Sequence, residues 1–242
     1  MALAIAVAVL GAVASPAAAG PSVTLSLGDE EGGGQVASTL QVVLLLTLLS
    51  LAPALILMVT SFTRIIIVLG FLRQAMSTQQ MPPNPVLIGL ALFLTVFVMS
   101  PVWSDIHDQA LRPYLDGDLS PQEALQKGAD PLRGFMMQQT REKDLALFQS
   151  LSRRGKPEGP RQLSLDVIIP SFMISELRQA FQMGFVLYLP FLIIDMVVAS
   201  VLMSMGMLMV PPVMISLPFK ILLFVLADGW HLVVRSLVSS FF

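Results

Sequence analysis

The chain has 242 residues, of which 55% are hydrophobic and 12% charged, whereas an average soluble domain has roughly 25% charged residues. This composition argues against a water-soluble fold, and the scattered Lys and Arg with a net charge of −2 argue against a nucleic-acid partner. The absence of cysteine excludes disulfides, thiolate metal sites and cysteine nucleophiles. Two histidines alone cannot build a histidine-rich metal site, so no metal or cofactor is expected.

Residues 1–19 are typical of a secretory signal peptide. An apolar stretch, residues 3–13, is followed by an Ala-x-Ala motif that ends at Ala19, where cleavage is expected. Because no Lys or Arg precedes the stretch, an uncleaved apolar helix is the alternative. Residues 20–38 are Gly-rich and acidic, and they are predicted to be a flexible exported segment.

Four apolar blocks follow, each near the roughly 20 residues that cross a bilayer as a helix. They predict an all-α membrane protein with about four apolar helices. The first block is too long for one simple span and is interrupted by Pro53 and by the polar "TSFTR" at 60–64, so we expect a broken or kinked helix there. The second follows the helix-stopping "MPPNP" at 81–85. The blocks are residues 40–72, 86–103, 185–205 and 213–238.

Residues 104–180 carry most of the charge and are predicted to be a mainly polar helical segment. One helix should start with a capping box, Ser120 with Glu123, and a second amphipathic helix is expected in 130–151 from its apolar spacing. The Gly- and Pro-rich stretch 152–162 reads as an exposed loop. If the signal peptide sets the topology, this segment is extracytoplasmic.

Methionines are concentrated in "VLMSMGMLMVPPVM", residues 201–214. Met205, Met207 and Met209 would scatter around a helix, but in an extended stretch they would all face one way. Gly206 and the following Pro-Pro pair indicate that the helix ends here. Three flexible, uncharged side chains would then project from a hairpin tip. The alternative is ordinary buried packing by an adaptable side chain.

Several longer segments resemble the FliP/SctR family, the export-gate proteins of type III secretion. The two signature segments are "PSFMISELRQAFQMGF" at 170–185 and "PFKILLFVLADGW" at 218–230. Three other shared blocks occur in the family's order, and the resemblance covers nearly everything after residue 40. "KGADPLRGFMMQQTREKDLALF" and the signal peptide look more like the flagellar branch than the injectisome branch. The other blocks are "TSFTRIIIVLGFLRQA" at 60–75, "PPNPVLIGLALFLTVFVMSP" at 82–101 and "MVPP" at 209–212.

The resemblance implies a core subunit of a protein export gate in the bacterial inner membrane, at the flagellar basal body. Such subunits assemble as a ring of five with FliQ and FliR, and with FlhB and FlhA, to pass unfolded export substrates. Residues 39–103 and 181–242 would fold as two helical hairpins around a periplasmic segment, 104–180. Met205, Met207 and Met209 would form a collar that seals the pore. An injectisome subunit or a small-molecule transporter is the alternative, although no inverted repeat supports a transporter.

Inserting an ionisable residue into a membrane as part of an apolar block costs free energy, so such a residue usually marks a charged partner or a transport pathway. Asp195 and Lys220 lie in consecutive blocks, so we expect them to pair across the hairpin in a structural role. Glu176 is predicted to bridge to Arg141, within or between subunits, the alternative being two solvated charges. Asp228 shares a helix face with His231 and Arg235 and is read as part of an interfacial network. Arg64 is a further charge inside an apolar block.

Two pairs of residues could suggest a catalytic site. Asp195 and Asp228 lie in consecutive apolar blocks, as the carboxylates of an intramembrane aspartyl protease would, but the usual glycine-flanked contexts are absent. Ser216 and Lys220 are one helical turn apart, as a Ser-Lys dyad might be, without further support. No catalytic residue is therefore predicted.

Overall fold

The computed structural model describes residues 34–78, 80–152, 163–207 and 209–242. They fall into two units, Met1–Ser50 and Leu51–Phe242. Helix α2 (Gly34–Met58) provides all the described structure of the first unit and continues into the second. It begins inside the segment predicted to be flexible. The predicted signal peptide, residues 20–33 and most of the loop 152–162 lie outside the described residues.

The first apolar block is broken at "TSFTR", as its polar residues predicted. Helix α2 ends at Met58 and α3 (Phe62–Ala75) begins four residues later. Between them the hydroxyl of Thr60 donates to the carbonyl of Leu57 at 3.2 Å, one of the carbonyls that a helix end leaves without a backbone partner. Pro53 lies inside α2 and does not end it.

The second block is also bent. Helix α4 (Asn84–Val98) starts directly after Pro83, whose extended backbone (ψ 152°) ends the "MPPNP" turn. The chain bends by 55° between α4 and the helical segment Ser100–Leu115, which begins with α5 (Ser100–Ile106). Met99 lies at the bend, and a proline follows in the first turn of α5. A short π-helix, η1 (His107–Leu111), and then α6 (Arg112–Leu115) follow α5.

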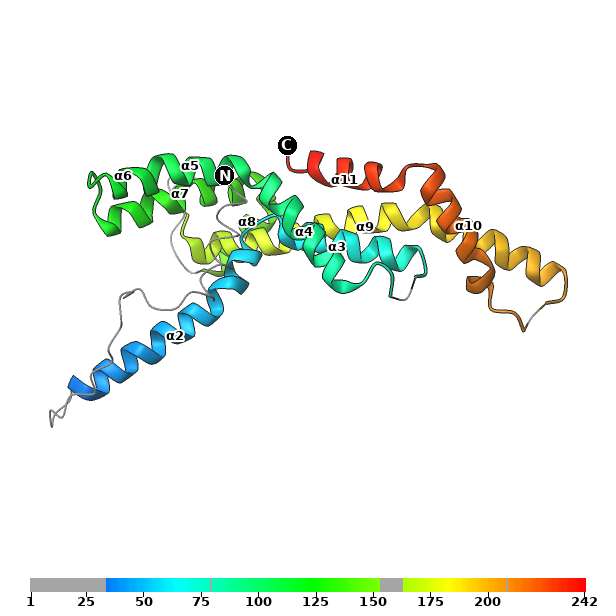
Figure 1. The fold of residues 1–242 in the computed structure, drawn as a ribbon, viewed down its shortest axis with the longest axis horizontal. Helices are drawn as coiled ribbons and strands as arrows, with labels where there is room; N and C mark the ends of the chain where they lie inside the picture. The colour runs from blue at the N-terminus through cyan, green and yellow to red at the C-terminus, as the bar shows by residue number, and fades with distance from the viewer. Residues whose placement is uncertain (1–33, 79, 153–162, 208) are drawn as a thin grey trace, which may run out of the picture. The chain divides into compact units, whose positions relative to one another are not determined.

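The polar segment folds as helices, with a different boundary from the predicted one. Helix α7 (Pro121–Gln139) starts with the predicted capping box and runs through Pro131, where a new helix was expected. A proline inside a helix removes one internal hydrogen bond and crowds the preceding turn without necessarily ending the helix, whereas Thr140 has an extended backbone (ψ 133°) where α7 ends. Helix α8 (Glu142–Leu151) follows. Figure 1 shows α7 beside α5 and α6.

Helix α9 (Leu165–Ser204) is continuous for 40 residues, so the predicted boundary between 180 and 181 falls inside one helix. At 1.5 Å per residue α9 is about 60 Å long, roughly twice the hydrocarbon thickness of a bilayer. It is the one described helix long and apolar enough to span a membrane, and three bent helix pairs raise the number of candidate spans to four. Among the described residues all regular structure is helical, as predicted.

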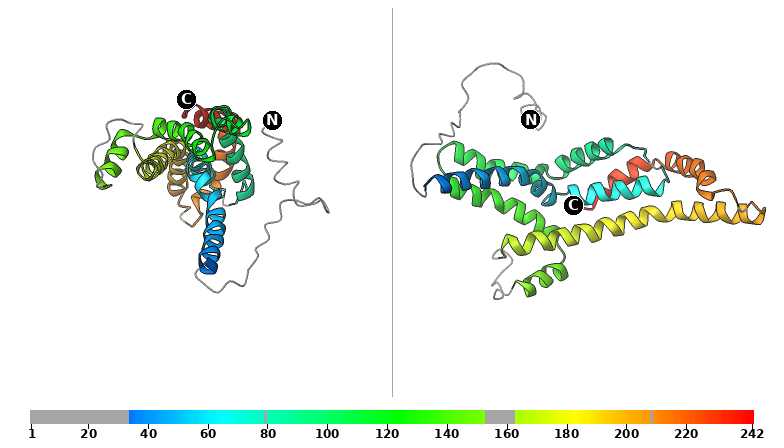
Figure 2. Two further views of the ribbon diagram at one scale, coloured as in Figure 1. Left: turned by 90° about the vertical axis from the view of Figure 1, so that its left-hand side faces the viewer. Right: turned by 90° about the horizontal axis from the view of Figure 1, so that it is seen from below.

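Helix α9 forms a hairpin with the apolar helix that follows it. Helix α9 ends in a Schellman motif: Gly206 (φ 74°) donates to Met203 O at 3.0 Å, and Met207 donates to Leu202 O at 3.0 Å. Helix α10 (Pro212–Leu226) then returns along α9, as Figure 2 shows.

A further bend, of 65°, separates α10 from α11 (Gly229–Ser239). Asp228 adopts the left-handed conformation here (φ 48°). A Cβ at Gly229 would come within 2.2 Å of the Phe224 ring, so only glycine lets the ring pack into the bend. The fourth apolar block is therefore two helices rather than one.

Helix α3 packs along α9 and forms the centre of the core with it (Figure 2). A Cβ at Gly184 would come within 2.5 Å of the Phe71 side chain, so this glycine allows the close approach of the two helices. Phe71 also contacts Phe181 edge-on, at 5.2 Å between ring centroids. Apolar side chains buried in this core include Val68, Leu69, Leu72, Ile168 and Phe172.

Candidate functional site

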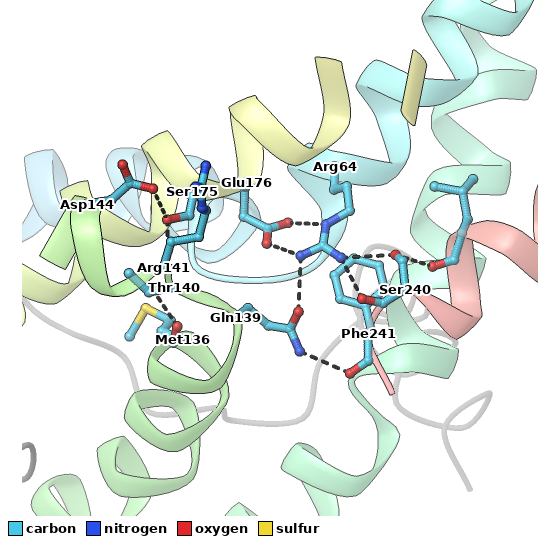
Figure 3. Close-up of polar contacts among 11 residues, drawn as sticks. Arg64, Met136, Gln139, Thr140, Arg141, Asp144, Ser175, Glu176, Ser240 and Phe241 are labelled. Carbon is cyan, nitrogen blue, oxygen red and sulfur yellow. Dashed lines mark hydrogen bonds and ion pairs between the residues drawn. The ribbon is translucent and has the colours of Figure 1, made fainter. Parts of the chain in front are cut away.

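Arg64, in the first turn of α3, is fully buried and donates every N–H of its guanidinium group (Figure 3). Nε donates to Glu176 Oε2 at 3.0 Å, and Nη2 donates to Glu176 Oε1 and to Gln139 Oε1 at 3.1 Å. Nη1 donates to the carbonyl and hydroxyl oxygens of Ser240 at 2.9 and 3.0 Å. The Phe241 ring lies over the guanidinium, with Cζ 3.8 Å from its centroid.

This cluster joins four parts of the chain: α3, α7, α9 and the residues after α11. Gln139 completes it by donating from Nε2 to the carbonyl of Phe241 at 3.0 Å. A buried ion pair is tolerated only where its geometry is good and its remaining hydrogen-bonding groups are satisfied. Both conditions hold here, so the arrangement can lock helices together but leaves no free cation or carboxylate for chemistry.

The predicted bridge from Arg141 to Glu176 is wrong within the chain, because Arg64 occupies both carboxylate oxygens. Arg141 instead precedes α8, and its backbone N–H donates to Ser175 Oγ at 3.1 Å. Ser175 Oγ in turn donates to Asp144 Oδ2 at 2.7 Å (Figure 3). Adjacent residues of a helix face about 100° apart, so Ser175 meets α8 while Glu176 meets α3.

The second buried cation is Lys220 of α10, whose side chain has no exposed area. Its Nζ donates to Asp195 Oδ2 at 2.6 Å, to Ser77 Oγ at 2.6 Å and to the carbonyl of Ala75 at 3.1 Å. Ser216 Oγ donates to the other oxygen of Asp195 at 2.6 Å. The contact expected between Asp195 and Lys220 is therefore present, and Ser77 and Ala75 are partners that the sequence did not predict.

These contacts bear on the two catalytic constellations considered from the sequence. Lys220 Nζ bonds Asp195, Ser77 and Ala75 rather than Ser216, so the two residues are not arranged as a Ser-Lys dyad. Ser216 donates to Asp195 instead. The two carboxylate oxygens of Asp195 are bonded to Ser216 and Lys220, so Asp195 is engaged with these groups rather than with Asp228.

Asp228 is exposed at the bend between α10 and α11. His231 and Arg235 line an open, mainly apolar groove with Phe97, Trp230 and Val234. The ion pairs found among the described residues do not include Asp228. The interfacial network predicted for these charges stays a prediction.

The three methionines of the predicted collar lie between the end of α9 and the start of α10. Met205, Met207 and Met209 are 67%, 42% and 98% exposed, so they do not fill the core of this chain. The helix end predicted at Gly206 is confirmed, and the tip is a turn rather than a helix. Groups of His, Asp and Glu suited to a metal ion do not occur in the described part of the chain.

A family model described as the FliP family matches residues 45–237 of this chain. The chain belongs to the FliP family. It is 58% identical to the flagellar biosynthetic protein FliP of Bacillus subtilis over 206 residues, 85% of this chain and 93% of the relative. It is 54% identical to the FliP protein of Pectobacterium carotovorum over 211 residues, 87% of this chain and 82% of the relative.

A third relative, the FliP protein of Caulobacter vibrioides, is 50% identical over 238 residues, 97% of this chain and 90% of the relative. The family suggested by the sequence segments is thus confirmed, and these relatives are flagellar proteins. With its long apolar helix α9, this member of the FliP family is a membrane protein of flagellar biosynthesis.

Proposed function

We propose that this FliP family member is a core subunit of the flagellar protein export gate. Several copies, five by family resemblance, form a ring whose pore passes unfolded export substrates. The observation that carries this proposal is the exposed methionine tip of the α9–α10 hairpin, three flexible apolar side chains presented together on a turn. The polar helices would lie on the periplasmic side of the inner membrane.

The apolar surface of the chain supports an assembly rather than a lone subunit. Large side chains are exposed along three helices, including Phe93 of α4 at 73%, Phe185 of α9 at 62% and Leu226 of α10 at 76%. Lipid alone cannot cover them all, because α9 is about 60 Å long and the hydrocarbon core only about 30 Å thick. Other subunits can cover apolar helices as well as lipid does.

Methionine suits a seal that must deform. Its side chain has three rotatable bonds and a polarizable thioether, so it adapts to irregular shapes without a charge that would hold a passing chain. The turn that carries these side chains is held by the two backbone hydrogen bonds around Gly206. A ring of such tips would exclude ions when empty and yield around a substrate.

FliQ, FliR, FlhB and FlhA are the proposed partners in this gate, on the basis of family resemblance. An injectisome gate subunit has the same physical requirements, but the relatives above are flagellar proteins. A transporter or protease reading predicts a different behaviour, activity of the isolated chain in liposomes.

Native mass spectrometry tests the proposal. The chain is co-expressed with the genes around its own and purified in mild detergent. We expect a complex with several copies of this chain and at least one further kind of subunit. A stable homodimer without other proteins would contradict the gate.

A further inference from the structure

We propose that Ser77 is a positioning residue for the α9–α10 hairpin. Its left-handed backbone and its hydroxyl together hold the Lys220 ammonium against the end of α3, so that one charged group ties α3, α9 and α10 together. This inference deepens the proposed gate function, and it rests on that function only for what the position of the hairpin is used for.

The last carbonyl groups of α3 cannot accept hydrogen bonds from N–H groups of the helix itself. Lys220 Nζ donates to Ala75 O at 3.1 Å, although the two residues are 145 positions apart in the chain. A cation at a helix C-terminus is also favoured by the helix dipole. The other carbonyls of the last turn accept hydrogen bonds from their own segment: Leu72 O from Met76 N, Gln74 O from Ser77 N and Arg73 O from Thr78 Oγ1.

The backbone of Ser77 is left-handed, with φ 57°. This conformation is strained for a residue with a Cβ, so the position after a helix end is usually Gly and sometimes Asn. The end of α9 follows that rule with Gly206 at φ 74°. Helix α3 instead has a serine there, and its Oγ accepts from Lys220 Nζ at 2.6 Å. The hydroxyl thus makes a contact that glycine cannot.

The contact between Ser77 and Lys220 lies where the α9–α10 hairpin meets the end of α3. Lys220 also donates to Asp195 of α9, so its three hydrogens reach the end of α3 twice and α9 once. Asp195 and Lys220 face each other across the two helices that carry Met205 and Met207 at their tip. The hairpin is therefore tied to the core at the place where its two helices leave α3, and the tie sets the direction in which the tip projects.

The test compares three substitutions by hydrogen–deuterium exchange of the full chain purified in mild detergent. Ser77→Gly relieves the backbone strain but removes the acceptor, whereas Ser77→Ala keeps the strain and removes the acceptor. Ser77→Asn tolerates the left-handed conformation and offers a side-chain oxygen. For amides in residues 213–221 we expect roughly tenfold faster exchange in the Gly and Ala variants, as for loss of one charge-assisted hydrogen bond, and near-normal exchange in the Asn variant.

A role limited to capping α3 predicts a different result, because glycine is the best residue at such a position. Ser77→Gly would then leave exchange in 213–221 unchanged, and that outcome would overturn the inference. Asp228→Gly is the matched control, since Asp228 is the other non-glycine residue with positive φ among those described and does not contact Lys220. Equal acceleration of 213–221 in this control would also contradict the inference.

Exchange is measured without reference to a pore or a substrate. If the gate proposal fails, the exchange pattern still decides the role of Ser77. If Ser77 proves to be only a cap, the methionine tip can still seal a pore.

Discussion

Two buried cations lie near the two ends of α3 and differ in how completely they are enclosed. Arg64 and Glu176 have no exposed side-chain area, and five hydrogen bonds join the Arg64 guanidinium to Glu176, Gln139 and Ser240, in three other segments. Lys220 is equally buried, but its partner Asp195 keeps 23% of its side chain exposed. One cluster is closed on all sides, and the other opens towards the outside at the hairpin.

Under the proposed gate function, the difference distinguishes a core that stays fixed from a hairpin that shifts. Breaking the Arg64 cluster leaves a charge that water cannot reach, so that cluster belongs to the core on which everything else is built. Asp195 can still be solvated when its contact with Lys220 opens. A hairpin tied by such a contact can shift without unfolding the chain, which is what a deformable seal requires.

The largest effect is expected from Arg64→Met, which leaves the Glu176 carboxylate buried without a partner. We expect a loss of about 3–5 kcal/mol in the free energy of unfolding, the usual cost of breaking one side of a buried pair. Unfolding by a denaturing detergent, followed through tryptophan fluorescence, measures it. The double variant Arg64→Met with Glu176→Met should lose less than the single one. A double variant that is less stable than Arg64→Met would show that the charge is not the cause.

Lys220→Met should have a smaller effect, about 1–3 kcal/mol, because the groups it leaves are polar or partly solvated. The same unfolding assay measures it. Exchanging the charges, Asp195→Lys with Lys220→Asp, should not restore stability, because Ala75 O is a hydrogen-bond acceptor that cannot bond a carboxylate. Full restoration by the exchange would mean that only the ion pair matters and that the tie to α3 does not.

The exposed carboxylate of Glu123 marks the low end of this series. Hydrogen bonds from the backbone N–H and the hydroxyl of Ser120 hold the pKa of Glu123 below its usual range. Because the pKa is lower in the folded state, the stabilisation is present above the unfolded-state pKa and is lost as pH falls through the folded-state pKa. The small difference in Tm between wild type and Glu123→Gln should therefore vanish in acid. A difference that stays constant with pH would contradict the charge-based cap.

Some of this arrangement could be predicted from the sequence because the signals are local. The capping box, the turn at "MPPNP" and the helix end at Gly206 each depend on a few neighbouring residues, and each is present in the structure. The contact between Asp195 and Lys220 was also within reach, since each is a lone charge in one of two consecutive apolar helices.

The Arg64 cluster could not be assigned in the same way. Arg64 and Glu176 are 112 residues apart, and two of the arginine's hydrogen bonds go to Ser240, whose carbonyl has no sequence signature. The position of Arg64 inside an apolar block indicated that its charge needs a partner, but it did not indicate which residue that partner is. The length of α9 was missed for a related reason: Ser171, Ser175 and Glu176 in its first half are buried in the core, whereas the sequence around them predicts a separate polar segment.

Ion conductance across a bilayer tests whether the methionine tips seal a pore, as proposed. The purified complex is reconstituted with Met205, Met207 and Met209 all replaced by alanine, beside wild type and a control with Met196→Ala on the exposed side of α9. We expect the triple variant to assemble and to leak small ions, while wild type and the control stay closed. An assembled triple variant that conducts no more than wild type would contradict the seal.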